Sequence, residues 1–278
     1  MTSIVPPLVR VGSKPGVVEY LRSLWARREF ALAIPAAELH AKHRNNILGG
    51  AWHVLNPLTQ VMVYFLIFGV ILRVDRGVDN FLGFIAIGVF VFHFTSRSVT
   101  AGGRSITSNE NLMRAISFPR AILPMAGVFA ELGAFGYALV TMIGVALLTG
   151  EALTWHWLLI IPIVGLQLLF NLGAAFFVAR AASHFRDVQQ VLPFVLRMWL
   201  YMSCVMWPIA RLEEKFPQAI GVMDFNPGYV FVQLVRSAVL ESEMGSMRLW
   251  LSACIWALTT LTLGFWFFRG RENEYGHE

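Results

Sequence analysis

The sequence predicts an all-α polytopic membrane protein with six transmembrane helices, and three observations lead to that fold class. Hydrophobic residues make up 56% of the 278 residues and charged residues only 14%, against roughly 25% charged in soluble domains. The mean hydropathy is +0.61. Several apolar runs of about 20 residues, each long enough to cross a hydrocarbon core of ~30 Å, alternate with polar segments. A single membrane domain is therefore favoured over a soluble globule.

The segment 1–53 is predicted to be cytoplasmic. It holds several charges and no long apolar core, so it does not read as a secretory signal peptide. From 16 to 40, apolar residues recur at helical spacing with arginines between them. This pattern predicts an amphipathic helix lying on the inner leaflet, with an ordinary solvated helix as the alternative.

The segment 54–268 is predicted to form the transmembrane domain, and 269–278 a cytoplasmic tail. Its predicted spans are Val54–Leu72, Phe81–Gly102, Ala121–Leu148, His156–Ala182, Val188–Trp207 and Leu249–Phe268. The apolar stretch Tyr229–Leu240 is too short to cross a membrane unaided, so it predicts a re-entrant or interfacial hairpin before the last span.

The basic residues are best explained by topology. The net charge is +5, and Lys and Arg lie mostly between the apolar runs rather than on one basic stripe, which argues against nucleic acid as a partner. They are more frequent in the segments that are inside when the amino terminus is inside. Both termini are therefore expected to be cytoplasmic, in the inner membrane of a bacterium.

Motifs for chemistry are absent from the sequence. There is no G-x-x-x-x-G-K-[ST], H-E-x-x-H, C-x-x-C or G-x-S-x-G, so we predict no catalytic residue, no metal site and no cofactor bound by this chain. Cys204 and Cys254 both lie in apolar runs, where cysteine is usually a small buried hydrophobe.

The stretch 105–120 is the most informative polar segment. It is predicted to hold a short helix parallel to the membrane, capped by Ser108 or Asn109 and ended by Phe118-Pro119, because proline disfavours helix in the residue before it. A simple connecting loop is the alternative.

Four blocks of sequence, in order along most of the chain, resemble permeases of the ABC-2 type polysaccharide exporter family. They are K-H-R-N-N-I-L-G-G-A-W-H-V-L-N-P at 42–57, S-N-E-N-L-M-R-A-I-S-F-P-R-A-I-L-P at 108–124, H-F-R-D-V-Q-Q-V-L-P-F at 184–194, and Asn226-Pro227 followed by Arg236. Cys204 departs from the family pattern, in which proline is common after the residue matching Ser203.

The resemblance implies a homodimeric permease that pairs with two copies of a separate ATPase, which would bind ATP and Mg. It assigns contact with that ATPase to a coupling helix made of Ser108, Asn109, Glu110, Asn111, Leu112, Met113 and Arg114. It assigns the interface and the entry to the first span to Leu48, Gly49, Trp52, Asn56 and Pro57. The implied cargo is a lipid-linked glycan such as O-antigen, teichoic acid, capsule or cell-wall galactan.

Two charges and two aromatic residues are further candidates. Glu131 and Arg197 both fall ~14 to 15 Å deep in their predicted spans, where ionisable groups usually face a partner or a wet cavity. They either form a pair, line the translocation path or fix helix packing. Trp207 and Tyr229 lie near the predicted outer mouth, where they line the path or belong to an aromatic belt.

Two other functions remain open from the sequence. An ABC-2 permease for a drug or a small lipid would share the six-span plan. An intramembrane transferase would need carboxylates or histidines gathered at one interface, and the acidic residues are instead scattered along the chain.

Overall fold

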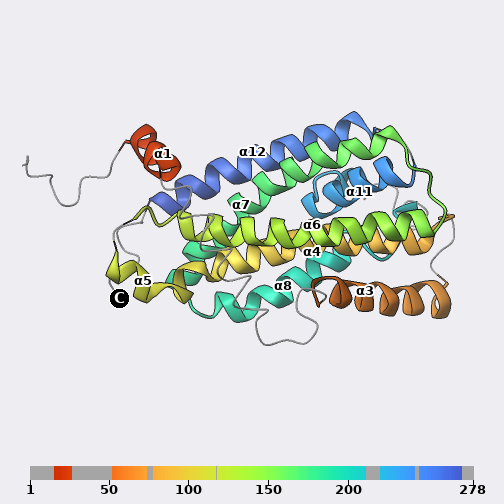
Figure 1. Cartoon of the computed structure of the whole chain (residues 1–278), viewed down its shortest axis with the longest axis horizontal. Helices are drawn as coiled ribbons and strands as arrows, with labels where there is room; N and C mark the ends of the chain where they lie inside the picture. Colours follow the sequence, from red (N-terminus) through yellow and green to blue (C-terminus); the bar gives the residue numbers. More distant parts are fainter. Residues whose placement is uncertain are drawn as a thin grey trace, which may run out of the picture.

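The computed structural model describes residues 16–26, 52–73, 78–116, 118–210, 220–241 and 244–270. Every regular element in these ranges is helical, so the predicted all-α class is confirmed. The helices form an elongated bundle (Figure 1). Its elements are α1 (Val17–Ala26), α3 (Trp52–Tyr64), the π-helical segment η2 (Phe65–Ile71), α4 (Phe81–Ser108), α5 (Glu110–Ala115), α6 (Ile122–Leu148), the 3-10 helix η3 (Trp155–Leu159), α7 (Ile160–His184), α8 (Val188–Met202), α10 (Ile220–Met223), α11 (Pro227–Val239) and α12 (Met247–Arg269).

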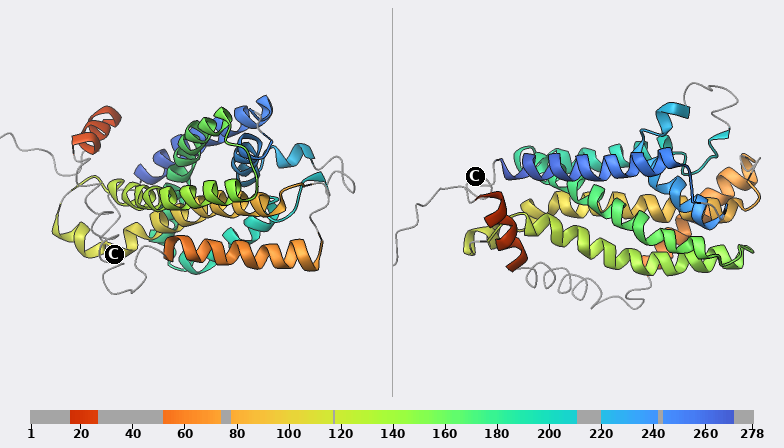
Figure 2. Two further views of the ribbon diagram at one scale, coloured as in Figure 1. Left: turned by 45° about the vertical axis from the view of Figure 1, so that its right-hand side comes forward. Right: turned by 90° about the horizontal axis from the view of Figure 1, so that it is seen from above.

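The two ends of the bundle differ in content. α1, α5 and the last turns of α12 lie together at one end, here called the α5 end (Figures 1 and 2). The connection from α6 to α7 lies at the opposite end, where α11 packs against η3. Any site on α5 is therefore separated from α11 by most of the length of the bundle.

Within the part of the chain that the structure describes, four helices are long and apolar enough to cross a membrane. α4 is at the centre, because 78% of its most apolar window is buried, against 28% for α6 and for α12. α4 packs on α6 and α7, and α7 packs on α12. The four helices correspond to the predicted second, third, fourth and sixth spans, and they are the Phe81–Ser108, Ile122–Leu148, Trp155–His184 and Met247–Arg269 segments.

The predicted first span, Val54–Leu72, lies in α3 and η2, which follow one another from Trp52 to Ile71, and their apolar part is Leu58–Ile71. The predicted fifth span is shorter in the structure, because α8 has 15 residues, or about 22 Å at 1.5 Å per residue. Neither α8 nor the apolar part of α3 and η2 matches a hydrocarbon core of ~30 Å by itself. The six-span count therefore stays a prediction.

Side chains at helix ends explain where several helices begin. The side-chain oxygen of Asn80 accepts the N–H of Gly83 at 2.9 Å and so caps α4. The amide nitrogen of Asn80 also donates to the Thr149 hydroxyl at 2.7 Å and to the Glu151 carboxylate at 2.8 Å. This one residue therefore ties the start of α4 to the loop between α6 and α7.

The N-terminal part of the predicted amphipathic helix is present as α1, and 27–40 lie outside the described residues. α4 continues to Ser108 rather than ending near Gly102. The predicted end was too early because the hydroxyls of Ser105 and Thr107 donate to carbonyls one turn back, so the polar residues remain compatible with the helix.

Candidate functional site

The α5 end is built around an elbow between α4 and α5. Asn109 interrupts the helix with φ −117° and ψ 26°, and its side-chain amide donates to the carbonyl of Ser105 at 2.8 Å. The hydroxyl of Ser108 donates to the carbonyl of Arg104 at 2.9 Å. The predicted short helix is present as α5, but the predicted cap is wrong, because both candidate side chains bond back to α4 and α5 has no side-chain cap.

The inner side of α5 is fixed in a hydrophobic cluster. Met113 of α5 is buried there together with Tyr20 of α1 and with side chains of four further helices. These are Ile106 of α4, Leu123 of α6, Phe176 of α7 and Phe268 of α12. Because buried side chains pack at crystal-like density, a force on α5 is transmitted to all four helices rather than absorbed locally.

Tyr20 joins α1 to the same cluster. Its side chain is only 3% exposed, and its hydroxyl oxygen accepts the backbone N–H of Ala121 at 3.4 Å. The ring lies 5.9 Å from the ring of Phe265, and the guanidinium of Arg269 lies 5.4 Å from the Tyr20 ring centroid. α1, the start of α6 and the end of α12 are therefore connected at one aromatic residue.

The connection from α7 to α8 borders α5 from the other side. Arg186 Nη2 lies 3.9 Å from Glu110 Oε1, and the side-chain amide of Gln189 donates to the hydroxyl of Thr107. Both members of the ion pair are exposed to solvent, so the pair adds little to stability. What it provides is a charged rim around α5.

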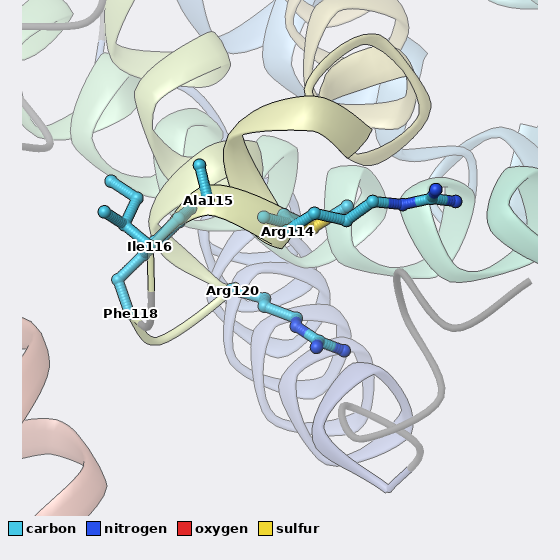
Figure 3. Close-up of a pocket in the computed structure, with 6 residues that line it drawn as sticks. Arg114, Ala115, Ile116, Phe118 and Arg120 are labelled. Atoms are coloured by element: carbon cyan, nitrogen blue, oxygen red, sulfur yellow. The ribbon is translucent and has the colours of Figure 1, made fainter.

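A pocket of about 380 Å³ opens beside α5. Figure 3 shows the side chains of Arg114 and Arg120 extending to the same side, while Ile116 and Phe118 lie on the other. The pocket thus has a cationic half and an apolar half. The lining residues are Met113, Arg114, Ala115, Ile116, Phe118 and Arg120.

At the opposite end, α8 stops early. The helix ends at Met202 rather than at the predicted Trp207. Ser203 and Cys204 form a turn, and Cys204 has a φ of +51°, in the left-handed region. The carbonyl groups of Cys204 and Val205 therefore leave the helical hydrogen-bond pattern while both residues are fully buried.

Arg236 satisfies these carbonyl groups. It is 1% exposed and lies on α11. Nη1 donates to the Cys204 carbonyl at 2.9 Å, and Nη2 donates to the Val205 carbonyl at 2.8 Å and to the Phe84 carbonyl at 3.0 Å. The guanidinium also lies 3.3 Å from the Phe84 ring centroid. A Cβ at Gly88 would lie 2.6 Å from Nη2, so glycine leaves the space for this group.

Asn226 forms the second connection between α8 and α11. Its side-chain oxygen accepts the N–H of Gly228 at 3.1 Å, which caps α11, and the indole N–H of Trp199 at 2.7 Å. Its amide nitrogen donates to the Met202 carbonyl at 3.1 Å. Arg236 and Asn226 together hold the interrupted end of α8 against α11 and α4.

The structure gives Glu131 and Arg197 separate surroundings. Glu131 lines a small cavity between α4 and α6 together with His93 and Arg97. Arg197 is exposed on α8 and interacts electrostatically with Tyr64 of α3. Within this chain the two are not brought together, and a role for either in the path stays a prediction.

The two aromatic candidates, Trp207 and Tyr229, differ in burial. Trp207 is half-buried and donates its indole N–H to the Tyr201 carbonyl at 3.1 Å, whereas Tyr229 is 5% exposed and belongs to the main core cluster. Of the predicted entry residues, Trp52 and Asn56 are exposed at the start of α3. Pro57 also lies in α3, and 48–49 lie outside the described residues.

Sequence reasoning gave Arg236 no structural role and did not name Tyr20, His93 or Arg97 as site residues. A signal was available for Arg236, because it is a charge inside the short apolar stretch 229–240, and such charges are costly and usually have a purpose. Tyr20 had no comparable signal, because its partners are distant in sequence: Ala121, for example, lies 101 positions away.

Comparison with known families identifies the architecture. A model of the ABC-2 type transporter membrane family matches residues 32–240. The chain belongs to the ABC-2 type transporter family. The match extends from before α3 to the end of α11, so it includes both the α5 elbow and the interrupted end of α8.

Relatives within the ABC-2 type transporter family are similar over most of their length. The O-antigen export system permease protein RfbA of Myxococcus xanthus is 25% identical over 93% of this chain and 98% of its own. The RfbA protein of Klebsiella pneumoniae is 24% identical over 72% and 75%, and the polysialic acid transport protein KpsM of Escherichia coli is 24% identical over 81% and 87%. The two RfbA proteins are named as export system permeases and KpsM as a transport protein.

Proposed function

We propose that this chain is the membrane-spanning permease subunit of an ATP-driven exporter that moves lipid-linked cell-surface polysaccharide across the cytoplasmic membrane. The observation that carries this proposal is the similarity over almost the whole length of a permease named for O-antigen export, together with a second relative named for polysialic acid transport. The proposed cargo is a glycan of the O-antigen, teichoic acid or cell-wall galactan type, and the names of the relatives support the polysaccharide class.

Two copies of a separate ATPase subunit supply ATP and Mg binding, and this chain binds no cofactor itself. The predicted coupling segment Ser108–Arg114 contacts that ATPase. Its exposed side carries Asn111, Arg114 lies in its last turn, and its inner side carries Met113 in the buried cluster. Closure of the ATPase dimer against the exposed side then tilts α4 and α6 as a rigid body, because the side chains of the cluster are too closely packed to take up the displacement of α5.

The permease is a homodimer of six-span subunits with both termini in the cytoplasm, and the stretch that contains α11 forms a re-entrant hairpin. The exposed face of α8 supports the dimer. Arg197 lies on it at a predicted midplane depth, and an arginine facing lipid there costs about 3 kcal/mol. A second copy or a water-filled path avoids this cost. In this arrangement α8 and α3 border the path, with Glu131, Trp207 and Tyr229 as further lining candidates.

The test is depletion of the protein in cells, followed by extraction and labelling of lipid-linked polysaccharide in each leaflet. Accumulation of finished polymer on the cytoplasmic side is the expected result, and it also identifies the glycan. Unchanged glycans with altered drug sensitivity would reject the proposal in favour of a permease for a drug or small lipid. Absence of a copurifying ATPase would reject the ATP-driven mechanism.

A further inference from the structure

We propose that the pocket beside α5 binds the phosphate group of an anionic phospholipid from the leaflet at the α5 end. The position of this leaflet on the cytoplasmic side rests on the proposed topology, but the binding itself does not rest on the cargo or the ATPase. The site consists of Arg114 and Arg120, with Ile116 and Phe118 opposite them.

The charge and shape of the pocket match a phosphodiester. Two guanidinium groups extend from one side of a pocket of about 380 Å³, and arginine is favoured for phosphate because its planar fork donates two parallel hydrogen bonds. Arg114 and Arg120 also have interactions within the chain. Each guanidinium carries five N–H donors, so an internal partner does not use up its capacity to bind an anion.

The apolar half of the pocket favours a lipid over a small soluble anion. Ile116 is 46% exposed and Phe118 is half-buried, and neither side chain contributes to binding a free phosphate. Against a phospholipid, they contact the glycerol and the first methylene groups, and each methylene removed from water contributes favourably. The pocket thus offers separate contacts to the two chemically different parts of one molecule.

The depth of the pocket is that of a lipid headgroup. α6 has 27 residues and is therefore about 40 Å long, close to the ~40–45 Å of a bilayer with its headgroups. If its last residue lies at the opposite surface, Ile122 lies at the headgroup level of the leaflet at the α5 end. Arg120 lies two residues before Ile122, so this placement of α6 brings Arg120 to the level of the lipid phosphates.

Native mass spectrometry of the purified full-length chain tests the proposal. The chain is incubated separately with dioleoylphosphatidylglycerol and with dioleoylphosphatidylcholine, and lipid retention is measured at increasing collision energy. We expect retention of phosphatidylglycerol over phosphatidylcholine, and about a tenfold weaker affinity for phosphatidylglycerol in Arg120→Gln, since one charge-assisted hydrogen bond corresponds to about that factor. Arg104→Gln is the matched control, because Arg104 is exposed near the same end but does not line the pocket.

Arg114→Gln serves as a second variant if Arg120→Gln yields too little folded protein. Equal retention by wild type and both variants would overturn the proposal, as would an equal loss in Arg104→Gln. Displacement of the lipid by millimolar inorganic phosphate would show a site for the free anion instead. Weaker capture of the partner ATPase by Arg120→Gln with unchanged lipid retention would assign the pocket to the ATPase interface. Because retention is measured without ATPase or glycan, failure of the proposed export function leaves this test intact.

Discussion

The block of α4, α6, α7 and α12 and the face formed by α3 and α8 are held together in different ways. In the block, α7 and α12 approach so closely that a Cβ at Gly173 would lie 2.3 Å from backbone atoms of Thr260. On α8, by contrast, Leu192, Leu196 and Leu200 are the buried side chains. The rest of that helix is exposed or partly exposed, including Phe194, Val195, Arg197, Met198 and Tyr201.

The difference separates a part that maintains the fold from a part that is available for partners. Small residues at helix crossings allow backbone contact, which is how membrane helices associate when no hydrophobic effect drives them together. The α8 face has large apolar side chains with one charge among them, and it ends in an interrupted turn held by Arg236. We therefore expect substitutions in the block to affect folding and substitutions on the face to affect assembly and transport.

The largest effect is expected for Gly173→Ala in the block. The added methyl group collides with the backbone of α12, which cannot move aside as a flexible side chain can, and overpacking of this kind costs about 3 kcal/mol or more. Gly165→Ala is the matched control, because it lies on the same helix with nothing within 4 Å of the new Cβ. Fluorescence-detected size exclusion and the thermal midpoint in detergent measure the difference. Similar midpoints for the two variants would show that α7 and α12 are not closely packed.

The sequence predicted the ends of α6 and α12 better than the end of α8. The third and sixth spans were expected at Ala121–Leu148 and Leu249–Phe268 and are observed at Ile122–Leu148 and Met247–Arg269, because hydropathy alone determines where a long apolar helix fits a bilayer. The end of α8 was missed. The turn at the end of α8 depends on Arg236, whose guanidinium donates to the Cys204 carbonyl 32 positions earlier in the sequence. No local sequence pattern encodes a hydrogen bond over such a separation.

For the candidate site, the presence of the short helix could be predicted from the sequence, but its cap and its contact with α1 could not. A short helix between the second and third spans follows from the polar segment, and α5 confirms it. The predicted cap is wrong because the side chains of Asn109 and Ser108 can form hydrogen bonds either with the first turn of α5 or with carbonyl groups of α4, and they form the latter. The connection of α1 to the elbow through Tyr20 depends on tertiary packing and has no counterpart in local sequence.

The second largest effect is expected at the boundary between the two regions, for Arg236→Met. Methionine fills much of the volume but leaves the carbonyl groups of Phe84, Cys204 and Val205 without their donor, which costs about 3 kcal/mol. Arg236→Lys keeps the charge but not the planar fork, so an intermediate loss is expected. Thermal unfolding in detergent measures both, with the exposed Arg248→Met as control.

A local readout distinguishes this loss from general destabilisation. Cys204 is 0% exposed in the wild type, and its turn is released when Arg236 is replaced. In a Cys254→Ser background, we expect Arg236→Met to react with maleimide faster than the unsubstituted protein, at a temperature well below unfolding. An unchanged labelling rate would mean that the turn is held by Asn226 alone.

A smaller effect on stability, but a clear one on assembly, is expected from cysteines on the α8 face. With both native cysteines replaced by serine, Phe194→Cys, Met198→Cys and Tyr201→Cys place thiols along the exposed side. If this face meets a second copy, at least one of them forms a disulfide-linked dimer under mild oxidation in membranes. Tyr137→Cys on α6 is the control, since it is 64% exposed but belongs to the block. Cross-linking through α6 and not α8 would place the dimer contact on α6 instead of α8.

The smallest effect is expected for the ion pair beside α5. α5 has an exposed side, which carries this pair, and a buried side, which carries Met113, so the two can be compared on one helix. Arg186→Gln removes a pair whose members are 86% and 37% exposed, so the free energy of unfolding should change by less than about 0.5 kcal/mol. Met113→Ala, on the buried side of the same helix, should cost about 2 kcal/mol or more. Thermal midpoints compare the two variants directly. An Arg186→Gln loss as large as that of Met113→Ala would mean that the charged rim maintains the elbow, and that α5 cannot present it to a partner without cost to the fold.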